Sequence, residues 1–199
     1  MKTIFIGLTG QTGAGKSTVS GFAEEMGYKI INADKVAREV IGNNSECVKR
    51  LAEIFGSDII NGDGSLNRKL LAQRAFSSRE NTDILNNITH PAIIAKVREY
   101  IDMYAKESDV IIFDAPQLFE SGGDKMCDTI IAVVAPVEVR LKRLMSRDGI
   151  SERDVLMRMN VQFDEDFFRA KCDHIIDGSK SVEDVRKQFK EIVEKVMKT

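Results

Sequence analysis

A glycine-rich segment near the N-terminus sets the strongest limit on the fold of this chain. Residues 10–17 read Gly-Gln-Thr-Gly-Ala-Gly-Lys-Ser and fit the pattern G-x-x-x-x-G-K-[S/T]. The segment follows an apolar run at 4–8 and precedes an amphipathic helical pattern that begins at Lys16. A strand, a glycine-rich loop and a helix in this order predict a phosphate-binding loop at the edge of a parallel sheet.

The residue types of this loop indicate how it would hold a nucleoside triphosphate. Glycines allow the backbone to curl so that successive N–H groups point at phosphate oxygens, and the following helix adds its positive N-terminal end. Lys16 reaches the β- and γ-phosphates, and the Ser17 hydroxyl ligates Mg²⁺. We therefore expect ATP and Mg²⁺ as cofactors. The expected nucleotide-binding residues are Gly10, Thr12, Gly13, Ala14, Gly15, Lys16, Ser17 and Thr18.

The rest of the chain alternates short apolar runs with longer helical patterns. This alternation is typical of βαβ units, and apolar runs without polar interruption are typical of strands buried on both faces. The candidate strands are 3–8, 29–32, 110–113, 129–134 and 174–176. The candidate helices are 16–26, 34–41, 45–55, 68–76, 79–89, 91–106, 137–147, 151–160 and 181–198. We predict an α/β fold of the P-loop NTPase type with three layers.

The spacing of the strands is uneven. Residues 33–109 separate the second strand from the third, far more than a single crossover helix needs, and they contain several helical patterns. Pro91 follows His90 and is expected in the first turn of a new helix, where its missing N–H leaves no bond unmade. A helical lobe inserted into the α/β sheet explains this spacing.

Composition excludes several classes of partner. The 199 residues carry 29 Lys and Arg against 31 Asp and Glu, a net charge of −2, so a nucleic-acid wrapper or a polybasic membrane binder is not expected. The three cysteines have no metal-ligand or disulfide spacing and indicate reduced thiols. With neither a signal peptide nor a membrane span in the pattern, we expect a cytoplasmic protein that is a monomer or a weak homo-oligomer.

The phosphate loop alone does not choose among ATP kinases, GTPases and ATP-driven machines. The chain contains neither a D-x-x-G switch nor an N-K-x-D guanine reader, which disfavours a GTPase. Residues 120–123 only faintly resemble a transporter ATPase signature. A small-molecule kinase is favoured; a nucleoside or nucleoside monophosphate kinase and an ATP-binding regulator without an acceptor remain as alternatives.

Two carboxylates come at the ends of candidate strands. Asp114 closes the run at 110–113, in the form in which a P-loop sheet presents an acid beside its magnesium. Asp34 follows the run at 29–32 and starts a helix. There it would either cap the helix or act on an acceptor hydroxyl, as a base or as an orienting acceptor, and spacing does not separate the capping role from the functional one.

A basic stripe provides further candidates. Arg140, Arg143 and Arg147 recur on one face of a predicted helix. Such a stripe is either a solvated face or an arginine clamp for a transferring phosphoryl group. Arg153 and Arg158 continue the basic character into the next segment, as in a lid that closes over the site and excludes water.

An ordered set of motifs resembles the dephospho-coenzyme A kinase family along essentially the whole chain. These are, in chain order, Gly7-Leu8-Thr9-Gly10, the loop at 10–17, Asn32-Ala33-Asp34 with Val36-Ala37-Arg38, Phe55-Gly56, Asp63-Gly64-Ser65-Leu66-Asn67-Arg68, His90-Pro91, Asp114-Ala115-Pro116-Gln117-Leu118-Phe119-Glu120, Arg143 with Arg147, Arg158 with Gln162, and Cys172-Asp173-His174-Ile175-Ile176.

The resemblance implies transfer of the ATP γ-phosphoryl group to the 3′-hydroxyl of dephospho-CoA, giving coenzyme A and ADP. The substrates would then be ATP and dephospho-CoA. It also implies one kinase domain over 1–199 with a five-stranded parallel core. The core would comprise about 1–41, 107–142 and 163–199, with a helical CoA-binding insertion at about 42–106 and a lid at about 143–162.

The resemblance also assigns roles to single residues. Asp34 becomes the expected base or metal-side carboxylate beside the 3′-hydroxyl, and Arg143 and Arg147 become phosphate contacts. Together with Lys16 these form the expected catalytic set, and Ser17 and Asp114 the metal set. The residues expected on the acceptor side are Asp34, Arg68, His90, Pro116 and Leu118.

The sequence departs from the family pattern at three places. Asn32 stands where the family commonly has Asp, Gln117 where a Leu is expected, and Asp177-Gly178-Ser179 lacks the Asn usual after the last strand. The Asn at 32 removes a carboxylate and so weakens any role of that position near the metal. Gln117 puts a polar group beside the acceptor cleft, and the change at 177–179 alters contacts near the adenine. None removes a group that phosphoryl transfer needs.

Overall fold

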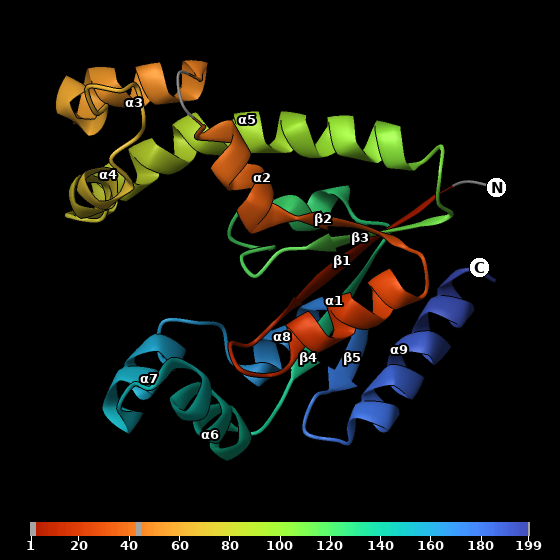
Figure 1. The fold of residues 1–199 in the computed structure, drawn as a ribbon. Helices are drawn as coiled ribbons and strands as arrows, with labels where there is room; N and C mark the ends of the chain where they lie inside the picture. The colour runs from red at the N-terminus through yellow and green to blue at the C-terminus, as the bar shows by residue number, and fades with distance from the viewer. Residues whose placement is uncertain (1–2, 43–44, 199) are drawn as a thin grey trace. The chain divides into compact units, whose positions relative to one another are not determined.

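The computed structural model describes residues 3–42 and 45–198 and contains a five-stranded parallel sheet. The sheet order is β2-β3-β1-β4-β5, visible in Figure 1. The strands are β1 Ile4–Gly10, β2 Lys29–Asn32, β3 Val110–Asp114, β4 Thr129–Val134 and β5 His174–Asp177. The α/β class and the five expected strands are confirmed; two strands have the expected bounds, and the bounds of the other three differ by one or two residues.

The central strand places the glycine-rich loop. β1 pairs with β3, with Leu8 opposite Asp114, and with β4, with Gly10 opposite Val133. Every residue of β3 and β4 is buried, as expected for central strands of a parallel sheet. The loop after Gly10 therefore leaves the sheet beside the C-terminal ends of β3 and β4, where ligands bind in open α/β sheets.

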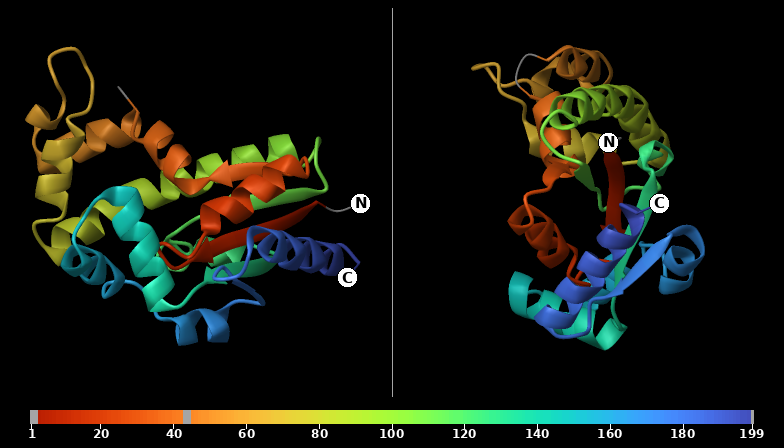
Figure 2. Two further views of the ribbon diagram at one scale, coloured as in Figure 1. Left: turned by 60° about the horizontal axis from the view of Figure 1, so that its bottom comes forward. Right: turned by 90° about the vertical axis from the view of Figure 1, so that its right-hand side faces the viewer.

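Alternate residues of the strands pack against different helices. Ile131 and Val133 belong to a core shared with α1 (Lys16–Glu25) and α9 (Val182–Val196), and these two helices lie side by side in Figures 1 and 2. Ala132 and Val134 instead pack with Phe168 of α8 (Glu165–Lys171). Period-two side-chain alternation thus divides β4 between two helical layers.

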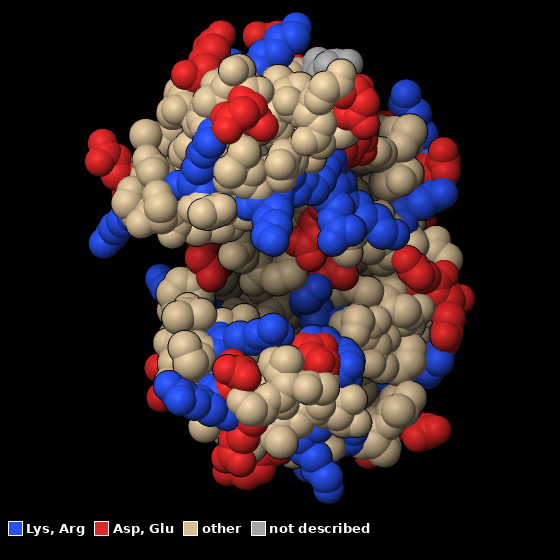
Figure 3. Space-filling model, turned by 60° about the vertical axis from the view of Figure 1, so that its left-hand side comes forward, with Lys and Arg blue, Asp and Glu red and all other residues tan. Residues whose placement is uncertain are grey.

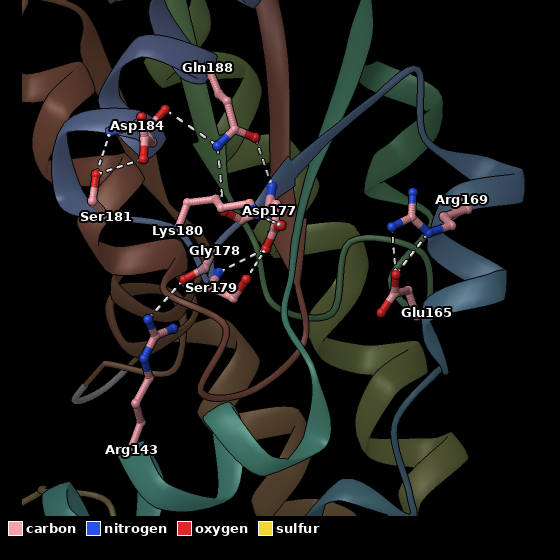
Figure 4. Close-up of polar contacts among 10 residues, drawn as sticks. All are labelled: Arg143, Glu165, Arg169, Asp177, Gly178, Ser179, Lys180, Ser181, Asp184 and Gln188. Carbon is pink, nitrogen blue, oxygen red and sulfur yellow. Dashed lines mark hydrogen bonds and ion pairs between the residues drawn. The ribbon is translucent and has the colours of Figure 1, made fainter.

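The other helices agree with the sequence expectation in most places. They are α2 Ala33–Val40, α3 Glu46–Phe55, α4 Arg68–Ala75, α5 Arg79–Tyr104, α6 Val137–Asp148 and α7 Glu152–Met159, with short 3₁₀ turns η1 Ser57–Ile59 and η2 Gly123–Met126. Helix α8 was not expected. Its signals are local: the Asp164 side chain accepts from Phe167 N–H at 2.8 Å, and Arg169 pairs with Glu165 one turn away (Figure 4).

The expectation of two helices meeting at Pro91 is wrong. Helix α5 is continuous, with Pro91 inside it, so His90 lies within a helix instead of at a junction. Proline removes one backbone donor from an α-helix, which disfavours this position without forbidding it. Buried neighbours on the same helix, Ile88 and Val97, show that packing holds the segment.

The chain forms two compact units. One comprises Met1–Ile31 with Met103–Thr199, and the other comprises Asn32–Asp102. The second unit contains α2, whereas the sequence analysis expects residues 1–41, and hence α2, in the core. This unit has its own apolar cluster, including Leu51 of α3, Leu71 of α4 and Ile88 of α5.

The Arg74 side chain connects the turns of the second unit. Arg74 of α4 donates to both carboxylate oxygens of Asp58, at 2.5 and 2.6 Å, and to the carbonyl of Phe55. This pair lowers the pKa of Asp58, with the hydrogen bonds from Arg74 as the main cause. The end of α3, the turn η1 and helix α4 are thereby joined through one guanidinium group.

The surface carries charges of both signs. On the face drawn in Figure 3, basic and acidic side chains are interspersed, in line with the net charge of −2. None of the helices within the described ranges has the length and apolar character needed to span a bilayer.

Candidate nucleotide and phosphoryl-transfer site

The backbone of the phosphate loop requires glycine at its start. Gly10 has a φ of 146°, and a Cβ there would lie 2.2 Å from the carbonyl oxygen of Val133. Gly13 and Gly15 also have positive φ, at 79° and 107°, where a side chain is strained. The glycines of the motif are therefore explained by close backbone approach to β4 and by left-handed turns.

The loop lysine is held by the carboxylate at the end of β3. Lys16 Nζ forms an ion pair with Asp114 Oδ1, and the Ser20 hydroxyl donates to Asp114 Oδ2 at 2.7 Å. The Asp114 side chain is only 7% exposed, so the pair is shielded from water. Asp114 and Lys16 thus meet as expected for a strand-end acid beside the phosphate loop.

A cavity of about 430 Å³ lies against the loop. It brings together all eight expected nucleotide-binding residues with Pro116, Arg143 and Arg147. Gly178, expected near the adenine, also lines it, and the remaining lining residues were not expected to bind nucleotide: Gln11, Leu144, Gln162, Lys180, Val182 and Val185. Leu118 is absent from this wall, because its side chain is fully buried against Gly7 and Gly123.

Arg143 binds backbone instead of projecting freely into the cavity. Its guanidinium donates to the carbonyls of Gly13 and Ala14, at 3.4 and 3.2 Å. It also donates to the carbonyl of Gly178 at 2.8 Å, the contact drawn in Figure 4. One side chain of α6 therefore connects the phosphate loop with the loop after β5. A planar group with five donors suits this role.

The other two arginines of the stripe have different surroundings. Arg147 contacts Asp148 at 2.7 and 3.1 Å, and Arg158 of α7 reaches the same carboxylate at 3.1 Å. These cations lower the pKa of Asp148, mainly through hydrogen bonds from Arg147. Arg140 is only 6% exposed and donates from Nε to the carbonyl of Ala135. The stripe is therefore not a uniformly solvated face: Arg140 is buried, and Arg143 and Arg147 line the cavity.

The segment after β5 packs directly on the phosphate loop. A Cβ at Gly178 would lie 2.0 Å from the carbonyl oxygen of Ala14. Asp177 shapes this turn by accepting from the N–H and hydroxyl of Ser179, at 2.9 and 2.6 Å, while its own N–H donates to Gln188 (Figure 4). The departure at 177–179 is thus an ordered turn. The available signal was its position after the last strand, at the ligand edge of the sheet.

The expected acceptor residues Asp34, Arg68 and His90 belong to the second unit. Asp34 is exposed in the first turn of α2, and the helix cap is Asn32, whose side chain accepts from Lys35 N–H at 3.0 Å. The capping alternative for Asp34 is therefore wrong. Because Asn caps as well as Asp, the Asn32 departure keeps the helix start intact.

Arg68 and His90 are fixed within their unit. Arg68 donates to the carbonyls of Arg38 and Ile41, at 3.3 and 3.2 Å, at the C-terminal end of α2. His90 is partly buried within α5, and burial lowers its pKa. The lowered pKa favours the neutral imidazole, which has one donor and one acceptor nitrogen.

The described residues contain no cluster of three or more His, Cys, Asp or Glu side chains that could enclose a metal ion. A divalent ion here would depend on phosphate oxygens together with few protein ligands. Magnesium in nucleotide sites commonly has this arrangement, since it retains several waters.

Comparison with known proteins places this geometry in a family. A family model described as dephospho-CoA kinase matches residues 4–184. A dephospho-CoA kinase of Corynebacterium glutamicum is 38% identical over 192 residues, covering 96% of this chain and 98% of that protein. Since both matches span nearly the whole chain, they include the sheet, the phosphate loop and the inserted helices.

Two solved structures are similar to this chain over nearly its whole length. The crystal structure of TT1252 from Thermus thermophilus covers 98% of both chains with a TM-score of 0.81 and 30% identity. A dephospho-CoA kinase structure from Campylobacter jejuni covers 98% of this chain and 97% of its own, with a TM-score of 0.66 and 28% identity. The chain belongs to the dephospho-CoA kinase family.

Proposed function

We propose that the protein transfers the γ-phosphoryl group of ATP to the ribose 3′-hydroxyl of dephospho-CoA, giving coenzyme A and ADP. The observation that carries this proposal is the phosphate loop and its cavity in a chain that matches the dephospho-CoA kinase family over residues 4–184. The activity is that of an ATP-using phosphotransferase with an alcohol acceptor.

The cavity supports a specific placement of ATP. The triphosphate lies over the loop amides at 13–18, and Lys16 exchanges its Asp114 contact for β- and γ-phosphate oxygens. The adenine lies toward the apolar part of the wall, lined by Leu144, Val182 and Val185. Arg143 supports this placement indirectly, because it joins the two loops that border the cavity.

Residues of the chain then act on the reacting groups. Asp34 accepts the proton of the 3′-hydroxyl while the hydroxyl oxygen forms a bond to the γ-phosphorus. At the same time the bond between that phosphorus and the ADP oxygen breaks. Lys16 and Arg147 offset the charge that develops on the phosphoryl and leaving oxygens. Arg68, His90 and Pro116 are the proposed acceptor contacts; Leu118 is left out because its side chain is buried.

The residues present fit a magnesium ion at the triphosphate. Ser17 is exposed in the cavity wall, and Asp114, whose carboxylate holds Lys16 of the same loop, closes β3. Both are oxygen donors, which magnesium prefers. When bound, the ion offsets phosphate charge and orients the β- and γ-oxygens.

An acceptor panel tests the activity. The protein is incubated with ATP, Mg²⁺ and dephospho-CoA, AMP, dTMP or adenosine, and products are identified by mass. Coenzyme A is expected as the phosphorylated product. Phosphorylation of a nucleotide or nucleoside without coenzyme A formation would refute the proposed substrate, and hydrolysis without any acceptor would refute transfer.

A matched pair of lysine variants tests the site. Lys16→Met should lower the turnover number by about 100-fold or more, because a charge that acts on the transferring phosphoryl group is lost. Lys142→Met changes an exposed lysine of α6 outside the cavity and should leave turnover unchanged. Equal activity of the two variants would rule out the assigned role of Lys16.

A further inference from the structure

A glutamine between α7 and α8 contacts the phosphate loop. Gln162 follows the end of α7 at Met159, and its Oε1 accepts a hydrogen bond from Thr12 N–H at 3.1 Å. The two residues are 150 positions apart in sequence. Gln162 also borders two cavities, the nucleotide cavity and a neighbouring one of about 640 Å³. The contact thus links the segment expected to form the lid with the loop that holds phosphate.

Anchors on both sides of Gln162 fix its position. On the C-terminal side, the ring of Phe163 stacks on Phe167 with centroids 3.7 Å apart, and Phe167 meets Phe119 edge to face at 5.1 Å. On the N-terminal side, Met159 packs with Leu144 of α6. These contacts hold the backbone on both sides of Gln162, whose exposed side chain meets the loop through its contact with Thr12.

The chemistry of a carboxamide suits this place. Its oxygen accepts from the Thr12 amide without bringing a negative charge toward a triphosphate, as a carboxylate would. Its nitrogen carries two donors, which match phosphate oxygens. Thr12 lines the cavity, but its N–H donates to Gln162 and is therefore bonded within the protein.

We propose that Gln162 is a positioning residue of the phosphoryl transfer: it fastens the segment after α7 to the phosphate loop at Thr12 and so keeps water away from the γ-phosphoryl group. This inference rests on the proposed function, because it concerns the choice between two acceptors at that site. If the fastening is lost, water replaces the 3′-hydroxyl as acceptor and ATP yields ADP and inorganic phosphate.

Three variants separate this role from a structural one. Gln162→Met keeps the side-chain length and removes the acceptor and both donors. Gln162→Glu keeps an oxygen that accepts from Thr12 N–H but adds a negative charge. Val161→Ala changes the adjacent residue, which is 85% exposed and lines neither cavity, as the matched control.

The readout is the ratio of inorganic phosphate released to coenzyme A formed, together with the KM for ATP and the melting temperature. For Gln162→Met we expect the ratio and the KM for ATP to rise about 3- to 10-fold, the change that corresponds to one hydrogen bond. Gln162→Glu should keep a ratio near wild type while its KM for ATP rises through charge repulsion. The melting temperature should change little in all three.

Other results would overturn the inference. A Gln162→Met ratio equal to that of Val161→Ala would show that Gln162 does not control the acceptor. Equal ratios in the Met and Glu variants would show that the contact with Thr12 is not the cause. If wild-type protein forms no coenzyme A at all, the proposed function fails instead, and the two failures are thereby distinguished.

Discussion

Replacing Gly178 by alanine should loosen the nucleotide cavity without touching a chemical group. The new Cβ would lie 2.0 Å from the Ala14 carbonyl oxygen, whereas ordinary contact begins near 3.4 Å, so the two backbones must separate by about 1.4 Å. Neither partner is a flexible side chain that can rotate away. Overpacking of this kind costs roughly 1–3 kcal/mol.

The same shift strains a second contact. The Gly178 carbonyl accepts from Arg143 at 2.8 Å, and weakening a hydrogen bond to a charged group adds about 1 kcal/mol. The combined loss of about 2–4 kcal/mol in the free energy of unfolding corresponds to a fall in melting temperature of about 4–16 °C for a chain of this size. Because the displaced loop includes Ala14, the KM for ATP should rise as well, by about 10-fold or more.

A second glycine-to-alanine change provides the control. Gly21 lies inside α1, and a Cβ there meets no atom within 4 Å. Gly21→Ala should therefore be neutral or stabilise the protein by up to about 1 kcal/mol, the helix preference of alanine over glycine. Thermal unfolding with and without ATP, together with steady-state kinetics, compares the pair. If Gly178→Ala matches Gly21→Ala in melting temperature and KM, the close packing of the two loops does not exist in solution.

Three further predictions concern individual side chains. Asp114→Asn should lower the turnover number by about 100-fold and raise the Mg²⁺ concentration for half-maximal activity, whereas Ser20→Ala should change the turnover number less than about 5-fold. Kinetics at varied Mg²⁺ compare the two variants, and equal losses of turnover would contradict a role for the charge of Asp114. Asp34→Asn should reduce the turnover number far more than the KM for ATP, and equal changes in both would exclude it as the base. Burial raises the pKa of Cys127 and Cys172 to about 12, so at pH 8 iodoacetamide should modify both thiols slowly in the folded protein and faster after denaturation. Mass spectrometry measures the labelling, and rapid labelling of the folded protein would refute this prediction.

Features encoded by neighbouring residues could be predicted from the sequence. The loop at 10–17 needs its glycines because the chain turns sharply beside β4, and this requirement is written into eight consecutive positions. The strands were recognisable because burial on both faces demands continuous apolar runs. Asp114 was predictable for the same reason, as the polar residue that closes such a run.

Features that depend on distant contacts could not be predicted in this way. Continuity of α5 through Pro91 depends on packing that outweighs one lost hydrogen bond. Arg143 was expected to bind phosphate; its carbonyl partners belong to the phosphate loop and to the loop after β5, two segments that only the fold brings together. Gln162 belongs to a sequence motif, yet its partner is a backbone N–H, which no pattern of residue types can indicate.

The cations of the nucleotide cavity already have protein partners, and this shapes how ATP can bind. Lys16 is paired with Asp114, Arg147 with Asp148, and Arg143 with backbone carbonyls. Binding of a triphosphate by Lys16 or Arg147 is therefore an exchange of one oxygen partner for another, and each exchange contributes only the difference between two contacts. A ligand with a single phosphate gains little from one exchange. A triphosphate would make several exchanges at once and also meet the loop amides, so we expect selectivity for ATP over shorter anions to arise from the number of partners replaced.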